Sequence, residues 1–239
     1  MRIIQQPAYV LHARAWRETS LLLEVFTRDL GRVGLLARSV RGSRARLPRS
    51  SLEPMQALCM DWAGRGELPT LAAVEPVGAP RVFRGEALLS AMYVNELLVR
   101  LTARNDPHPA LFDRYGGLLD ELMDAGSLAW SLRCFERDLL EAIGYALQLD
   151  VAADTGHPIM NDAHYDYLPE SGAVAADGHP DAVRVRGSAL RALATGERPD
   201  AQDMAALRRL MRNLIGRQVG SRGLQSWRVL AESFVCDRP

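Results

Sequence analysis

The chain has 239 residues, of which 48% are hydrophobic, enough for one large domain or two ordinary domains with a buried core. Its formal net charge is zero and it contains no lysine, so each of its 29 basic residues is an arginine. The lack of lysine excludes a P-loop or Schiff-base lysine, and three widely spaced cysteines exclude a disulfide framework or a paired-cysteine metal site.

The N-terminal third shows the short apolar runs and turn signals of β-strands. Gly64-Arg65-Gly66 marks a hairpin turn, because glycine tolerates positive φ. Several short strands without a long helical pattern favour a small closed barrel such as the five-stranded OB-fold, which commonly binds oligonucleotides. We therefore expect an OB-fold domain over residues 1–78, with strands at 9–12, 21–27, 33–37, 55–62 and 71–75.

Trp16 lies between Arg14 and Arg17 in a polar segment, so its indole can stack on an exposed base. Phe26, in contrast, is expected in the core. We expect His12 to be a packed or hydrogen-bonded residue of a strand rather than a catalyst, since no nucleophile accompanies it.

An arginine-rich segment begins within the third predicted strand. No acidic residue lies between Leu30 and Leu52, and the glycine, serines and proline of this segment argue against a regular helix. Residues 1–52 hold ten arginines and three acids, a net charge of +7 that the rest of the chain offsets. A basic loop on a small β-domain can hold a phosphate backbone without reading bases, although solvated arginines are the simpler alternative. The candidate arginines of the loop are Arg38, Arg41, Arg44, Arg46 and Arg49.

Helical periodicity replaces the β pattern after residues 76–80, which are rich in proline and glycine. We therefore expect a mainly helical domain over residues 81–239, with a turn-rich insertion near 150–184, and an α+β fold class for the whole chain. The predicted helices are 86–103, a helix after 106–109 with Leu111, Tyr115, Leu118 and Leu122 on one face, a helix from Ser127 to Gly144, 201–216 after Asp200, and a short last helix with Trp227, Leu230 and Phe234. Within the insertion, 165–168 and 182–185 are predicted to form a hairpin.

Candidate catalytic and metal-binding residues are few. The chain has no GxSxG or HExxH motif. The histidines and aspartates of the insertion lack the tight spacing of metal ligands, so we predict neither a metal nor another cofactor, and no enzymatic activity. The residues in question are His157, Asp162, His164, Asp166, Asp177 and His179.

The N-terminal segment lacks the apolar core of a signal peptide, and no apolar run approaches the ~20 residues that span a bilayer. We therefore expect a cytoplasmic protein, associated with the nucleoid through its DNA.

Arg133 and Arg137 lie four residues apart on the polar side of the helix predicted to start at Ser127. Most such residues are solvated or form weak ion pairs along the helix. They can also form the basic rim of an apolar groove that receives an acidic peptide.

A set of short motifs runs in order along nearly the whole chain. In the first third they are Tyr9-Val10-Leu11-His12-Ala13-Arg14, Trp16-Arg17-Glu18-Thr19-Ser20, Gly31-Arg32-Val33 and Gly64-Arg65-Gly66-Glu67-Leu68. In the helical part they are Tyr93-Val94-Asn95-Glu96-Leu97-Leu98, Asp106-Pro107-His108-Pro109 and Arg133 with Phe135-Glu136. The ordered set resembles the bacterial recombination mediator family RecO.

The resemblance implies an N-terminal OB-fold, a helical C-terminal domain and no enzymatic activity. Proteins of this family bind single- and double-stranded DNA, anneal complementary strands, and act with RecR to help RecA displace the single-stranded-DNA-binding protein SSB. The resemblance also implies a pocket for the acidic tail of SSB, with Arg133 contacting the tail carboxylates. By position, the implied DNA surface comprises Arg14, Arg17, Arg32, Arg38, Arg41, Arg44, Arg46 and Arg49.

The sequence departs from the family pattern in two places. Many members carry four zinc-binding cysteines after the third helix, whereas residues 150–181 contain none, so this region must be stabilised by packing. Ser39 stands where the family often has glycine. Two other function classes remain open: a protein-interaction scaffold whose OB-like module does not hold DNA, and a metal-dependent nuclease or hydrolase that uses the 157–179 loop.

Overall fold

The computed structural model describes residues 2–40, 47–64, 66, 68–124 and 126–229, and these residues form two compact units. The first unit comprises residues 1–123 and 224–239, and the second comprises residues 124–223. The second unit is thus inserted between two segments of the first.

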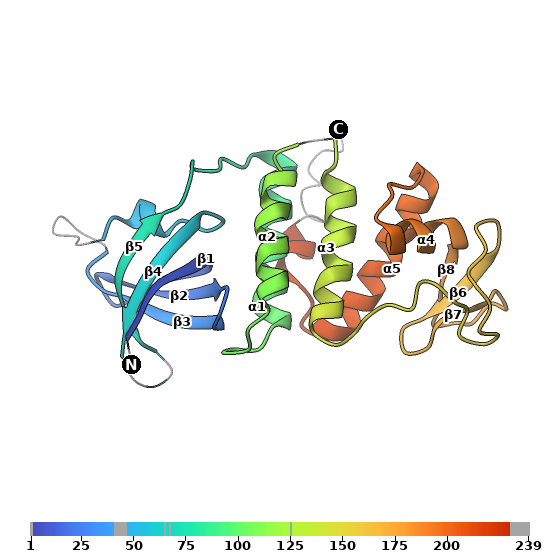
Figure 1. Cartoon of the computed structure of the whole chain (residues 1–239), viewed down its shortest axis with the longest axis horizontal. Coiled ribbons are helices and arrows are strands. Elements are labelled where there is room, and N and C mark those ends of the chain that lie inside the picture. Colours follow the sequence, from blue (N-terminus) through green and yellow to red (C-terminus); the bar gives the residue numbers. More distant parts are fainter. Residues whose placement is uncertain (1, 41–46, 65, 67, 125, 230–239) are drawn as a thin grey trace. The chain divides into compact units, whose positions relative to one another are not determined.

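The first unit contains a closed five-stranded barrel in the order β1-β2-β3-β5-β4 (Figure 1). Its strands are β1 Arg2–Trp16, β2 Ser20–Thr27, β3 Gly31–Ala37, β4 Ala57–Ala63 and β5 Thr70–Pro76. A short 3-10 helix, η1, spans Arg49–Leu52 between β3 and β4. The barrel followed by a helical region confirms the predicted α+β fold class.

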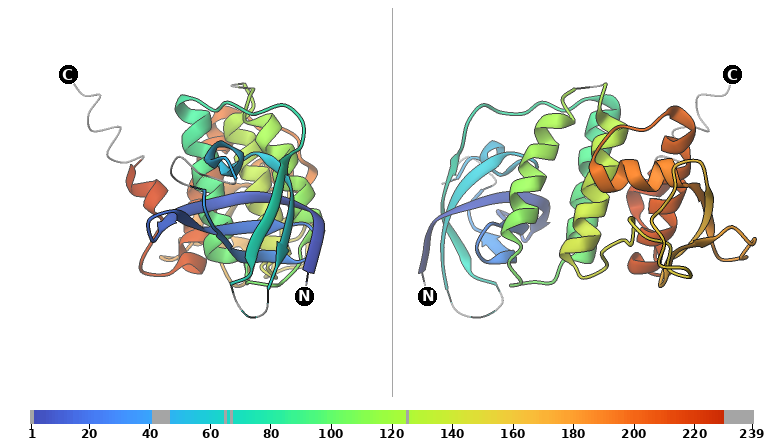
Figure 2. Two further views of the ribbon diagram at one scale, coloured as in Figure 1. Left: turned by 90° about the vertical axis from the view of Figure 1, so that its left-hand side faces the viewer. Right: turned by 45° about the vertical axis from the view of Figure 1, so that its right-hand side comes forward.

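The first strand is far longer than the predicted segment 9–12, so that prediction of its limits is wrong. β1 pairs with β4 in its first half and with β2 in its second half. Shifts in register between Ile3 and Gln6 and between Val10 and His12 let it curve round the barrel, as both views of Figure 2 show. The polar Gln5-Gln6-Pro7 run gives no strand signal in the sequence, yet it belongs to this curved strand.

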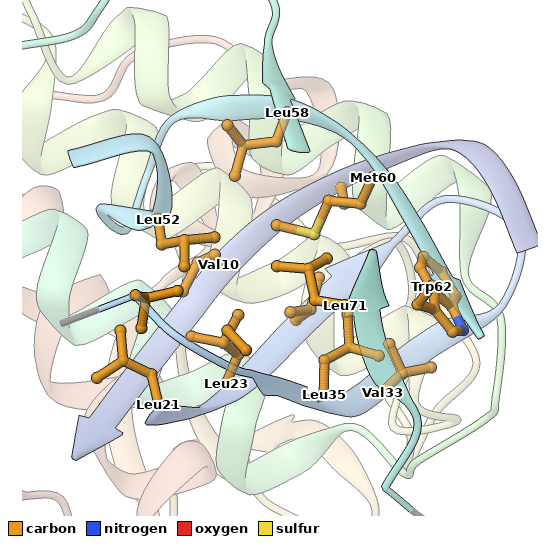
Figure 3. Close-up of a cluster of buried hydrophobic side chains, with 14 residues drawn as sticks. Val10, Leu21, Leu23, Val33, Leu35, Leu52, Leu58, Met60, Trp62 and Leu71 are labelled. Carbon is orange, nitrogen blue, oxygen red and sulfur yellow. The ribbon is translucent and has the colours of Figure 1, made fainter. Parts of the chain in front are cut away.

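The barrel interior is filled by aliphatic side chains from all five strands (Figure 3). Val10, Leu35 and Met60 are fully buried there, and Leu52 of η1 is 2% exposed among them. Leu52 therefore anchors η1, and with it the end of the arginine-rich segment, to the barrel.

Two helices, α1 (Gly85–Leu101) and α2 (Pro109–Glu121), belong to the same unit as the barrel. Tyr9 of β1 packs edge-on against Tyr115, with ring centroids 4.9 Å apart. Phe26 of β2 is fully buried, as predicted, and contacts Phe112. These aromatic contacts join the barrel to α2. That residues 1–78 form a domain of their own stays a prediction.

A buried amide connects the barrel to both helices. The Nδ2 of Asn95 in α1 donates to the backbone oxygen of Leu11 in β1 at 3.0 Å. Its Oδ1 accepts a hydrogen bond of 2.6 Å from the hydroxyl of Tyr115 in α2. Burial raises the pKa of Tyr115, so its hydroxyl stays protonated and donates.

The second unit combines α3 (Leu128–Ala142), α4 (Gly187–Thr195) and α5 (Ala201–Val219) with a small sheet. The sheet has the order β7-β6-β8, with β6 at His164–Leu168, β7 at Gly172–Ala175 and β8 at Val183–Arg186 (Figure 1). The expected β6–β8 pairing is present, but β6 is a central strand because it also pairs with β7, which the sequence analysis missed.

Residues 225–229 are helical and belong to the first unit. They contain Trp227 of the predicted last helix, whereas Leu230 and Phe234 lie outside the described residues.

Asp166 is the polar centre of the turn-rich insertion. Its Oδ1 accepts from the Nε of Arg184 at 3.0 Å. Its Oδ2 accepts from the backbone nitrogens of Gly178 at 2.6 Å and His179 at 3.2 Å. Of the histidines, cysteines and acids that the structure describes, no three are grouped as metal ligands. The hydrogen bonds of Asp166 connect β6, β8 and the 178–179 turn.

Asp166→Asn should destabilise the protein at neutral pH and weaken the dependence of its unfolding free energy on pH in acid. The hydrogen bond from Arg184 lowers the pKa of Asp166 from 3.8 to about 2, so its stabilisation is complete above the ordinary pKa and lost as the pH falls through about 2. Urea unfolding should show a deficit at pH 7 that narrows between about pH 4 and pH 2. Asp162→Asn, at an exposed position, is the matched control. A deficit independent of pH would contradict this account.

Tyr115→Phe should lower the free energy of unfolding by about 1–3 kcal/mol, because it leaves the buried Oδ1 of Asn95 without its Tyr115 donor. Chemical denaturation followed by circular dichroism measures the change. Tyr145→Phe removes an exposed hydroxyl and should have almost no effect. Equal stability of the Tyr115 variant and the parent would show that the amide does not hold α2 to the barrel.

Candidate nucleic-acid interface

The candidate interface lies at the end of the barrel where β1 turns into β2. The pairs Trp16–Ser20 and Leu21–Ala37 bring the ends of β1 and β3 to this turn. The backbone nitrogen of Val40 donates to the oxygen of Thr19 at 2.9 Å, which holds the start of the arginine-rich segment beside the turn. η1 closes the same end, because Leu52 enters the barrel core. Figure 3 shows Leu21 and Leu52 near one end of the core and Trp62 near the other.

We call this surface the basic end and define it by five described residues. All five are exposed, and the indole of Trp16 is 41% exposed. Within the part of the chain that the structure describes, none of its four guanidinium groups forms an ion pair. The surface therefore offers uncompensated positive charge beside an aromatic ring, as single-stranded nucleic acid requires. The members are Arg14, Trp16, Arg17, Arg38 and Arg49.

Two members of this region have strained backbones. Arg17 has φ of +52° and Ser39 has φ of +54°, in the left-handed region that favours glycine. Glycine would adopt the backbone conformation of Ser39 without strain. Both conformations occur where the chain turns at the ends of β1 and β3.

Arg32 was expected on the DNA surface, and the structure does not place it with the basic end. Its NH1 lies 2.8 Å from Glu24 Oε2, and its NH2 donates to the backbone oxygen of Thr102 at 2.8 Å. Its side chain is only 13% exposed. Arg32 therefore holds the segment after α1 against β3, and we leave it out of the proposed interface.

Other arginines of the first unit are also neutralised. Arg104 pairs with the same Glu24, and Arg28 makes two hydrogen bonds, of 3.1 and 3.0 Å, with Asp113. The bonds from Arg28 lower the pKa of Asp113, which keeps the pair charged. Local sequence gives no signal for these pairs, because each pair joins a barrel residue to a residue far away in the chain. Arg28 pairs with Asp113 of α2, and Glu24 pairs with Arg104 after α1.

Arg41, Arg44 and Arg46 lie outside the described residues, so their place in the DNA surface stays a prediction. They follow Arg38 directly in the chain and precede Arg49.

The candidate partner-binding arginines lie on α3 in the second unit. Arg133 was expected on the polar side of its helix, but it is 9% exposed and pairs with Glu136, itself 1% exposed. Arg137 bonds to Asp138 through Nε at 2.9 Å and also to the backbone oxygen of Leu193. Of the possibilities given for Arg133, the structure shows an ion pair along the helix, and the spacing of Arg133 and Glu136, one helical turn apart, was the signal for it.

Arg133→Met should destabilise the protein by about 3–5 kcal/mol, since it removes the guanidinium group that pairs with the buried Glu136 carboxylate. Thermal or urea unfolding checks this, with Arg191→Met at an exposed position of α4 as the control. If the Arg133→Met variant were as stable as the parent, the pair would have no structural role.

Comparison with known proteins identifies the family of the chain. The family model "Recombination protein O N terminal" matches residues 1–80, and "Recombination protein O C terminal" matches residues 83–228. The chain belongs to the recombination protein O family. The DNA repair protein RecO of Stenotrophomonas maltophilia K279a is 43% identical over 235 residues, which cover 97% of this chain and 98% of that protein. The DNA repair protein RecO of Xanthomonas euvesicatoria pv. vesicatoria 85-10 is 44% identical over 237 residues, with the same coverage.

Membership of the RecO family makes this chain a DNA repair protein that acts in recombination. Among the described residues, no helix of the RecO-family chain has the length and apolar character needed to cross a membrane.

Proposed function

We propose that the chain binds DNA strands by their phosphates at the basic end of the barrel and anneals complementary strands during recombinational repair. In the same proposal it acts with RecR at the nucleoid to load RecA on SSB-coated single-stranded DNA. It does so as a binding protein, without catalytic residues, a metal or another cofactor.

One observation supports this proposal above the others: within the described residues the arginines of the basic end lack a carboxylate partner, unlike several other arginines of the first unit. Arg28, Arg32 and Arg104 each have a carboxylate partner, whereas Arg14, Arg17, Arg38 and Arg49 have none within the described residues. Uncompensated guanidinium groups attract phosphates and release their counterions. Trp16 adds a surface on which any base can stack.

Annealing follows from the same chemistry. Two complementary strands repel each other through their phosphates, and arginines that neutralise phosphates on both strands reduce that repulsion. Contacts of this kind carry no sequence information, so any complementary pair would anneal.

For the second unit, we propose that the acidic tail of SSB binds beside α3 through Arg133 and Arg137. The side chain of Arg137 is 24% exposed, against 11% for Arg133, so Arg137 is the more accessible to a carboxylate. Both guanidiniums already have acceptors, and the tail would compete with Asp138 and Glu136 for them.

The alternative function is a protein-interaction scaffold with an OB-like barrel that does not hold DNA. Direct DNA binding by the full chain separates the two.

Arg17→Glu/Arg38→Glu should weaken binding of single-stranded DNA by at least about tenfold at ~50 mM salt, because two phosphate contacts become repulsive. Fluorescence anisotropy with a labelled oligonucleotide measures the affinity, and annealing of labelled complementary strands is followed in parallel. Both positions are exposed, so the fold should be kept.

Arg208→Glu/Arg209→Glu makes the same change of net charge at exposed positions of α5 and should bind DNA like the parent. An equal loss of DNA affinity in both variants would mean that net charge, and not the basic end, determines binding. Unchanged affinity in the first variant would make the basic end a bystander and favour the scaffold.

A further inference from the structure

A groove opens next to the basic end, within the first unit. Its cavity of about 750 Å³ is bordered by β1, η1, α1 and residues 225–229. Pockets that bury drug-sized ligands have volumes of about 300–1,000 Å³. The groove is therefore large enough for planar rings rather than for a single ion.

The groove is mainly apolar. Leu11, Leu52 and Met55 line it and are at most 8% exposed. Met92 of α1 also lines the groove. Its large apolar side chain is 50% exposed. Leu89 and Val99 extend the same helix face. A surface of this kind favours a ligand with apolar faces.

The groove lining also carries two basic residues, two acids and a histidine. Arg49 and Arg100 contribute to its lining, as does His12, which is exposed rather than packed as the sequence had suggested. Of the two acids, Glu96 accepts hydrogen bonds from the backbone nitrogens of Gln225 at 2.7 Å and Ser226 at 2.8 Å. These two N–H groups partly compensate the carboxylate charge of Glu96. Glu53 is the remaining acid of the lining.

The groove is continuous with the basic end. Arg49 belongs to both surfaces. Along β1, His12 lines the groove and lies on the same face of the strand as Arg14 and Trp16 of the basic end. A strand held by its phosphates at Arg14 and Arg49 would thus have its bases within reach of the apolar walls.

We propose that this groove binds unpaired nucleobases of a strand whose phosphates lie on the basic end. The proposal rests on the proposed function, and it adds a base-binding subsite with a stated substrate class: single-stranded DNA. The bases of a duplex are stacked and paired, so only unpaired nucleotides can turn their faces into an apolar groove. His12 offers a ring for stacking, and Met92 and Val99 offer aliphatic contact.

The subsite gives a physical reason why a bound strand can anneal to its complement instead of staying coated by the protein. The groove would keep the bases of a bound strand unstacked and unpaired, while the arginines of the basic end hold its phosphates. Pairing with a complementary strand withdraws the bases from the groove, so the duplex product keeps only its phosphate contacts and is released more readily.

The test compares two oligomers of equal length and charge with the full-length protein: oligothymidylate, and an abasic oligomer with the same phosphates. Anisotropy should show about tenfold tighter binding of oligothymidylate, since each base–ring contact is worth ~1–3 kcal/mol. Equal binding of both oligomers would overturn the base-binding subsite while leaving the phosphate contacts of the proposed function intact. Failure of both to bind would overturn both proposals.

Met92→Glu and Met92→Gln assign the base preference to the groove. Each should bring the affinity for oligothymidylate close to that for the abasic oligomer, and the uncharged glutamine shows that the loss is not repulsion alone. Met123→Glu is the matched control, because Met123 belongs to the same unit, is 51% exposed and does not line the groove. If the Met92 variants keep the full preference, the bases bind elsewhere, for instance on Trp16, and the groove is left for another class of partner.

Discussion

Charge compensation distinguishes Arg28, Arg32 and Arg104 of the first unit from the four arginines of the basic end. Glu24 lies on β2 and pairs with both Arg32 and Arg104, while Asp113 on α2 pairs with Arg28. These acids hold the segment after α1 and the helix α2 against the barrel, so their arginines serve the fold. No described acid pairs with the guanidiniums at the β1–β2 turn, so these remain available to an external anion. The account of function depends on this division.

The Asn95 contacts give the barrel a fixed helical partner. Because Asn95 bonds to Leu11 and Tyr115, β1 and the helices α1 and α2 form one compact unit. The same contacts create the groove, since α1 can present Met92 to β1 only if it is held there. A fragment that ends near residue 78 would lack α1, and with it one wall of the proposed base subsite.

The sequence predicted the barrel because its strands carry apolar residues bounded by turn residues, as in β2 and the Gly64–Gly66 turn. It did not predict the first half of β1, where Gln5-Gln6-Pro7 is polar and two register shifts bend the strand. It named the arginines of the basic end, whose contact with DNA stays a prediction. It named Arg32 with them, because the acceptors of Arg32, Glu24 and the oxygen of Thr102, come together only in the folded barrel. The Asp166 contacts were equally hidden, since one aspartate meets a turn and a strand 12 to 18 residues away.

The salt dependence of DNA binding by the intact protein tests the central claim most directly. If at least four uncompensated arginines each contact a phosphate, the logarithm of the association constant for single-stranded DNA should fall with the logarithm of salt concentration with a slope of about −3 or steeper. A flat response between about 50 and 200 mM salt would contradict the account, because it would mean that the free guanidiniums of the barrel do not hold the DNA.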